Sequence, residues 1–175
     1  MARAGVSREA DASTADHLVE LLLCLRTFEG VDTTRDLWLL VARVSVGVMF
    51  FISGWGKAAN PTKFAADFAA WGIPEPDLAS TATAWAELIL GALLVLGLLT
   101  RLAAAGLAVT MLGAIYYSVW PAATEASTTA TGFVSQFFYS PEWLLLLVLL
   151  ALAGAGPGRF ALDEPFGVEA RLQRR

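Results

Sequence analysis

Four blocks of almost uninterrupted hydrophobic residues divide this chain. They cover about residues 37–55, 81–99, 102–120 and 141–156, with polar or proline-containing stretches between them. The hydrocarbon core of a bilayer is about 30 Å thick, so a helix needs roughly 20 apolar residues to cross it. Because no water reaches the backbone inside lipid, each block that crosses must be helical. The pattern therefore predicts four transmembrane helices, of which the last is the shortest.

The links between the blocks predict how these helices are arranged. Only Thr100 and Arg101 separate the second block from the third, so these two helices must lie side by side in opposite directions. Antiparallel helices with short links form up-and-down bundles. We therefore expect an all-α membrane protein: a four-transmembrane-helix up-down bundle in residues 37–165, preceded by an N-terminal cytoplasmic segment (residues 1–36) and followed by a cytoplasmic tail (residues 166–175).

The link after the first block has a helical pattern of its own. Asn60-Pro61 resembles a helix start, with a capping residue and a proline in the first position. Phe64, Phe68 and Trp71 then recur on one helix face, and Gly72 ends the run. This predicts a short interfacial helix on the outer surface, with a lid over a site as the alternative. The other outer link, residues 122–132, is small and polar, which favours a mobile loop.

The first 36 residues do not resemble a signal peptide. Their arginines alternate with acidic residues, and their apolar run is short and is interrupted by Glu20. Leucines recur there at helical spacing, namely at Leu18, Leu21, Leu22 and Leu25. We expect a short amphipathic helix on the inner membrane face, with a partly disordered tail as the alternative.

Positive charges predict the orientation of the helices. Nine of the 12 lysines and arginines fall on one side of the predicted membrane: Arg3, Arg8, Arg26, Arg35, Arg101, Arg159, Arg171, Arg174 and Arg175. The other side carries Lys57 and Lys63. The positive-inside rule then places both termini in the cytoplasm of a multi-pass protein of the cell (plasma) membrane.

Composition agrees with the membrane assignment and limits the chemistry. Hydrophobic residues make up 57% of the chain and charged residues 16%, whereas soluble domains are nearer half and a quarter. The single cysteine, Cys24, and the single histidine, His17, both precede the first block. We therefore expect no disulfide chemistry, haem or metal site in the bundle, no evident intrinsic cofactor and no nucleic-acid partner. Electrons passing through this protein would need a bound quinone or a partner protein.

Charged residues inside the apolar blocks are the candidate functional residues. An ionisable residue at bilayer depth costs about 2.5–3.5 kcal/mol on insertion scales, so it indicates a function by default. Arg43 and Glu87 lie within blocks, and Lys57 and Glu142 lie near outer ends. We expect a polar network of Lys57, Glu87 and Glu142 in the outer half of the bundle, which Arg43 joins from below.

Simpler explanations exist for each charge. Lys57 and Arg43 could extend to the headgroups on their own sides. Ser140-Pro141-Glu142 has the form of an ordinary helix start. Glu87 could belong to an ion pair that only fixes helix packing.

Glycines predict which helix faces meet inside the bundle. Arg43, Gly47, Gly54 and Lys57 share one face of the first helix, and Glu87 and Gly91 share one face of the second. Small residues allow helix backbones to approach closely in lipid. The predicted packing glycines are Gly47, Gly54, Gly91, Gly106 and Gly113.

Several stretches resemble the DoxX family. They are LLVARVSVGVMFFISGWGKAANP (residues 39–61), FAADFAAWGIPEP (64–76), AWAELILGALLVLGLLTRLAA (84–104) and GPGRFALDE (156–164). The resemblance spans residues 37–165. Arg43, Lys57, Glu87 and Gly91 match the residues characteristic of that family.

The resemblance implies a small four-helix membrane protein of the DoxX/DoxD type. Some relatives are subunits of a thiosulfate:quinone oxidoreductase, and others associate with redox enzymes at the membrane. The resulting expectation is a redox-associated subunit in the lipid bilayer that binds a quinone or docks a soluble or membrane oxidoreductase, rather than a catalyst alone. A non-catalytic scaffold and a small-solute transporter, acting as a homo-oligomer, are the alternatives.

Overall fold

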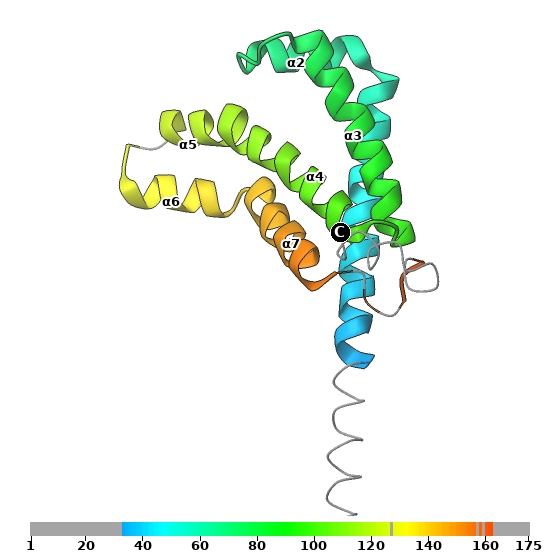
Figure 1. Cartoon of the computed structure of the whole chain (residues 1–175). Coiled ribbons are helices and arrows are strands. Elements are labelled where there is room, and N and C mark those ends of the chain that lie inside the picture. The colour runs from blue at the N-terminus through cyan, green and yellow to red at the C-terminus, as the bar shows by residue number, and fades with distance from the viewer. Residues whose placement is uncertain (1–32, 127, 157, 159, 163–175) are drawn as a thin grey trace, which may run out of the picture. The chain divides into compact units, whose positions relative to one another are not determined.

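The structure of the protein is a computed structural model that describes residues 33–126, 128–156, 158 and 160–162. These residues form helices joined by short links, with no strand among them (Figure 1). Residues Leu39–Arg175 form one compact unit that contains the site. Of the preceding unit, Met1–Trp38, the structure describes only the start of the helix Thr33–Ala59. The predicted helix at residues 18–25 and the tail at 166–175 lie outside the described residues.

Three described helices are long and apolar enough to cross a membrane. They are Thr33–Ala59, α3 (Pro76–Leu96) and the continuous helix Thr100–Ala126. The last consists of α4 (Thr100–Ala114), the π-helical turn η1 (Ile115–Val119) and α5 (Trp120–Ala126). A fourth crossing requires α6 (Ala130–Phe138) and α7 (Pro141–Ala155) together, which meet at a bend of 54°. The all-α membrane class is confirmed, with three or four spans.

The helices extend beyond the hydrophobic blocks that predicted them. Helix α3 begins at Pro76, before its block, and α5 continues to Ala126, into the residues that we expected to form a loop. Much of that predicted loop is therefore helical, and α6 follows it, capped by Thr129, whose side chain accepts a hydrogen bond from the Gly132 backbone. The prediction failed because small polar residues are compatible with helix once a cap is present.

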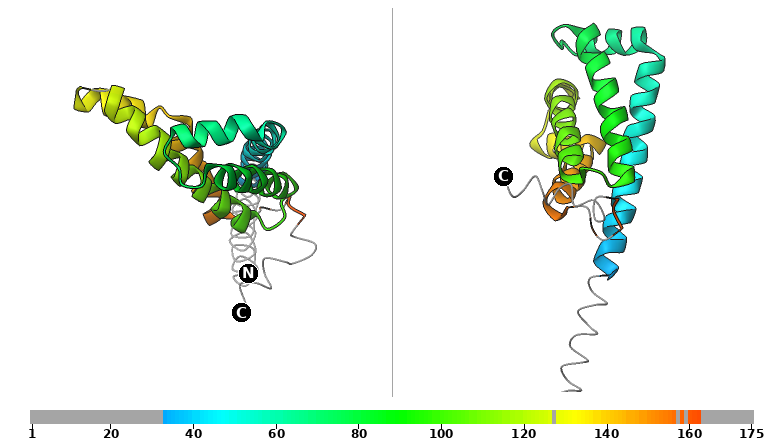
Figure 2. Two further views of the ribbon diagram at one scale, coloured as in Figure 1. Left: turned by 90° about the horizontal axis from the view of Figure 1, so that it is seen from above. Right: turned by 45° about the vertical axis from the view of Figure 1, so that its right-hand side comes forward.

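Helix α2 (Pro61–Ala70) is the short helix predicted after the first span. Its proline occupies the first turn, and Gly72 adopts a positive φ of 71° just beyond its end. Phe68 of α2 is buried, and α2 packs against α3. In both figures α2 lies at the end of α3 and of the first helix (Figures 1 and 2).

Two helix contacts build the core of this unit. Helices α4 and α7 share a leucine-rich core that includes Leu107, Leu146 and Leu149. Helix α7 returns antiparallel to α4, since a Cβ added at Gly156 would lie 3.1 Å from the guanidinium of Arg101. Helix α3 runs beside the first helix in every view (Figures 1 and 2).

Glycines set the distance between the first helix and α3. A Cβ added at Gly54 would lie 2.5 Å from the Leu88 backbone nitrogen, and one at Gly91 would lie 2.7 Å from that of Phe51. Gly47 lies equally close to α3, since its added Cβ would be 2.9 Å from the Gly91 carbonyl oxygen. Only a residue without a side chain allows this approach.

The other two predicted packing glycines differ from each other. A Cβ at Gly106 would lie 2.6 Å from a Leu90 methyl group, so this glycine does lie at the contact of α4 with α3. A Cβ at Gly113 would meet nothing within 4 Å. The packing role predicted for Gly113 is therefore wrong, because this residue faces a cavity rather than a neighbouring helix.

Candidate functional site

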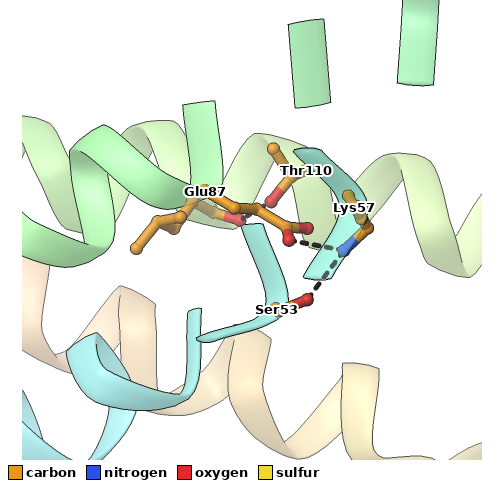
Figure 3. A network of polar contacts seen from close by, with 5 residues as sticks. Ser53, Lys57, Glu87 and Thr110 are labelled. Atoms are coloured by element: carbon orange, nitrogen blue, oxygen red, sulfur yellow. Dashed lines mark hydrogen bonds and ion pairs between the residues drawn. The ribbon is translucent and has the colours of Figure 1, made fainter. Parts of the chain in front are cut away.

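Lys57 and Glu87 form an ion pair between the first helix and α3. The ammonium Nζ lies 2.5 Å from Glu87 Oε2 and also donates a hydrogen bond of 2.7 Å to Ser53 Oγ (Figure 3). The Lys57 side chain is 13% exposed and that of Glu87 only 4%. Two charges are thus held largely out of solvent, each with its partner in place.

The local sequence explains why these groups meet. Ser53 and Lys57 are four residues apart and therefore lie on one face of their helix. Glu87 lies one turn before Gly91, at the level where Gly54 lets the two backbones touch. Thr110 of α4 lines the same cavity as Glu87, and its hydroxyl donates to the Leu107 carbonyl at 2.7 Å (Figure 3). Ser53, Lys57 and Glu87, from the first helix and α3, thereby form one polar cluster.

A cavity of about 590 Å³ adjoins this cluster. Its walls are mainly apolar and come from the first helix, α3, α4, η1 and α7, and the polar cluster occupies part of one wall. Lining residues include Met49, Phe50, Ser53, Lys57, Glu87, Thr110, Tyr117 and Leu145. Ligand pockets of proteins are typically about 300–1,000 Å³, mostly apolar, with a few placed polar groups.

Helix α2 and the residues after it cover part of the cavity. Phe68, Trp71 and Ile73 all line it, and the rings of Phe68 and Trp71 lie 5.6 Å apart. The sequence predicts a membrane anchor for this aromatic face, with a lid as the alternative. Phe68 is buried and lines the cavity, whereas Trp71 lines it and is 43% exposed. This face therefore contributes to the cavity wall, and the membrane anchor stays a prediction.

Glu142 lines the same cavity from the first turn of α7. It is half-buried, and its carboxylate has no hydrogen bond or ion pair within the part of the chain that the structure describes. The Ser140 side chain caps α7 by accepting from the Trp143 backbone, as the Ser-Pro-Glu pattern predicts. Glu142 therefore shares the cavity with Lys57 and Glu87 without bonding to either.

Arg43 does not join the network, contrary to our expectation. It is 1% exposed, and its Nη2 donates a hydrogen bond of 2.9 Å to the Phe160 carbonyl. Its guanidinium also lies against Gly97, where an added Cβ would be 2.5 Å from Nη1. The helical rise places Arg43 about 21 Å from Lys57 along their shared helix. The chain after α7 supplies the carbonyl that holds Arg43 at that opposite end.

The sequence did not single out Ser53, Tyr117 or Thr110 as site residues. A usable signal existed for Ser53, which precedes Lys57 by one helical turn. Thr110, Gly113 and Tyr117 recur on one face of the third predicted span, and all three line the cavity. Among the described residues no group of three or more His, Cys, Asp or Glu side chains could hold a metal ion.

These features define a small helical membrane protein with a buried ion pair at the wall of an apolar cavity. The DoxX family model matches residues 38–120. The chain is also 32% identical over 129 residues to the uncharacterized membrane protein Rv3486 of Mycobacterium tuberculosis, covering 72% of this chain and 79% of that protein. The protein therefore belongs to the DoxX family, as its motifs predicted. No solved structure matches the chain.

Proposed function

We propose that this protein is a redox-associated membrane subunit that binds a quinone in the cavity beside Lys57 and Glu87. The observation that supports the proposal is the composition of that cavity: about 590 Å³ with mainly apolar walls and one buried ion pair. A quinone has the matching chemistry, with an apolar ring and tail and a few carbonyl oxygens that accept hydrogen bonds.

Each residue has a defined role in this proposal. Ser53 and Glu87 hold the Lys57 ammonium in position, and the ammonium would donate a hydrogen bond to a quinone carbonyl. Phe68 and Trp71, which line the cavity, would cover the ring. A quinone supplies reversible two-electron chemistry when it is bound. An oxidoreductase partner, soluble or in the membrane, would exchange electrons with it.

Quinone binding can be measured directly on the purified protein in lipid nanodiscs. A short-chain ubiquinone analogue should saturably quench part of the fluorescence of the six tryptophans, of which Trp71 lines the cavity. Mass spectrometry of the extracted native membrane should detect bound quinone. Replacing the pair together by Lys57→Met and Glu87→Leu should abolish saturable binding. Lys63→Met removes a lysine of the same region that is 70% exposed, so it is the matched control and should bind normally.

The scaffold alternative makes the opposite prediction. The Lys57–Glu87 pair is complete without any ligand, which is what a purely structural ion pair would need. If the double variant binds the analogue as the wild type does, or if neither binds it saturably, the quinone proposal is wrong and the pair serves packing.

A further inference from the structure

Lys57 lines two cavities. Besides the large cavity, a second one of about 80 Å³ lies on its other side, bounded by the end of the first helix, the start of α2 and the first turns of α3. Its remaining lining residues are Ala58, Pro61, Ser80, Thr81, Ala84 and Trp85. On α3 the large cavity is lined by Ala79, Thr83 and Glu87 instead. The two cavities therefore lie on different faces of α3 and have Lys57 in common.

The small cavity suits water rather than an organic ligand. A site that holds a water molecule needs about 10–15 Å³ of accessible volume and two to four polar partners. The small cavity exceeds that volume several times, and Lys57, Ser80 and Thr81 line it. The Ser80 hydroxyl donates to the Asp77 carbonyl and can still accept a hydrogen bond from water. Ala58, Pro61 and Thr81 at its border are exposed, so it lies next to the surface of the protein.

We propose that the small cavity is a water-filled access route to the Lys57–Glu87 pair from the side of the membrane on which α2 lies. The inference rests on the proposed function, because a quinone in the large cavity would displace water there. The small cavity would then remain the contact of the pair with water. When the proposed oxidoreductase partner reduces the ligand, the Lys57 ammonium gives a proton to the reduced ligand oxygen. A proton from bulk solvent, relayed through this water, then replaces it, so the pair returns to its original charge and no hydroxide is left in the cavity.

Cysteine labelling tests the access route on the full chain. In a Cys24→Ser background, Ser80→Cys places a thiol in the small cavity and Ala79→Cys places one in the large cavity. Ile89→Cys, half-exposed on the apolar surface of α3, is the reference for a lipid-facing thiol. Lys63→Cys on α2 reports which vesicles expose the α2 side. The probe is the silver ion Ag⁺, which binds thiols, is close to a water molecule in size and does not cross membranes. The thiols that it leaves free are counted with a maleimide after denaturation.

The expected result is that Ser80→Cys reacts from the same side as Lys63→Cys, and severalfold faster than Ile89→Cys. Adding Ala58→Phe should slow this reaction severalfold, because the larger side chain blocks the border of the small cavity. Ala59→Phe, at the neighbouring exposed position outside both cavities, is the matched control and should leave the rate unchanged. The access route is refuted if Ser80→Cys reacts no faster than Ile89→Cys, or if Ala58→Phe has no effect.

A saturating quinone analogue separates this inference from the proposed function. The bound analogue should protect the thiol of Ala79→Cys in the large cavity from labelling and leave the thiol of Ser80→Cys reactive. Protection of Ser80→Cys would contradict an independent water route. Fast labelling of Ser80→Cys without any protection of Ala79→Cys would support the water route and count against quinone binding.

Discussion

The Lys57–Glu87 pair is the residue-scale feature on which the site depends. Both side chains are largely buried, and each satisfies the charge of the other. A buried ion pair contributes little net stability because desolvation offsets the attraction, but removal of one partner leaves an uncompensated charge. The pair is therefore more sensitive to a single substitution than to replacement of both residues.

Lys57→Met should lower the free energy of unfolding by about 3–5 kcal/mol, since Glu87 remains buried and unpaired. The double variant with Glu87→Leu should recover most of that loss. Lys63→Met breaks the exposed contacts of the ammonium with Asp67 and with the Phe64 ring and should cost about 0–1 kcal/mol. Unfolding in detergent by denaturant measures all three, and equal losses in the two single variants would contradict the burial of the pair.

Gly54 and Gly113 should respond to alanine with opposite signs. A Cβ at Gly54 collides with backbone atoms of α3, so Gly54→Ala should destabilise the protein by about 1–3 kcal/mol. Gly113→Ala meets open space in a helix and should stabilise it by about 0.5–1 kcal/mol. Thermal unfolding of the two variants in one detergent tests this prediction. If both substitutions change the stability in the same direction, the contact between the first helix and α3 at Gly54 is wrong.

At the scale of elements, α2 links the membrane helices to the site. Its aromatic face was recognisable from the sequence, but the surface against which this face packs was not. The spacing of Phe64, Phe68 and Trp71 is equally suitable for a membrane surface and for a cavity. Only the turn at Gly72 and the start of α3 at Pro76 bring this face over the large cavity. Such long-range placement has no local sequence signal.

Phe68→Ala should weaken binding of a quinone analogue while leaving the helices intact. Burial of a Phe side chain contributes about 1.5–3 kcal/mol, so a loss of affinity of about 10- to 150-fold is expected. Phe138→Ala removes an aromatic ring of α6 outside the large cavity and should bind normally. Fluorescence titration measures both affinities, and equal affinity would mean that α2 does not cover the ligand.

The pattern of hydrophobic blocks predicted the helices well and their ends less well. Apolar residues indicate which stretch of the chain can lie in lipid. The helix ends depend instead on caps such as Thr129 and Ser140 and on positive-φ residues such as Gly97. The Lys57–Glu87 pairing could be anticipated because both residues share helix faces with glycines. The attachment of Arg43 to Phe160 could not, since it depends on where the chain goes after α7.

At the scale of the whole molecule, the number of crossings decides the orientation of the termini. Three helices satisfy the length and apolarity of a span, and a fourth crossing needs α6 and α7 together across their 54° bend. An even number of crossings places both termini on one side of the membrane, and an odd number places them on opposite sides. The distribution of arginines predicts the even number, with both termini in the cytoplasm.

Reporter fusions test this prediction. A reporter active only in the cytoplasm should be active when fused after Arg175 and inactive when fused after Ala126, if α6 and α7 complete a fourth span. Activity at both sites or at neither would show that α6 and α7 do not cross. A fusion after Leu99, in the turn between α3 and α4, is the cytoplasmic control.

The order of Lys57 and Glu87 along the chain has a consequence for biogenesis. Lys57 precedes its partner by 30 residues, with α2 and the first half of α3 between them. During synthesis the helix that carries the ammonium is therefore available before the carboxylate leaves the ribosome. Glu87 can then meet its counter-ion as α3 partitions from the translocon into lipid, instead of crossing as an isolated charge.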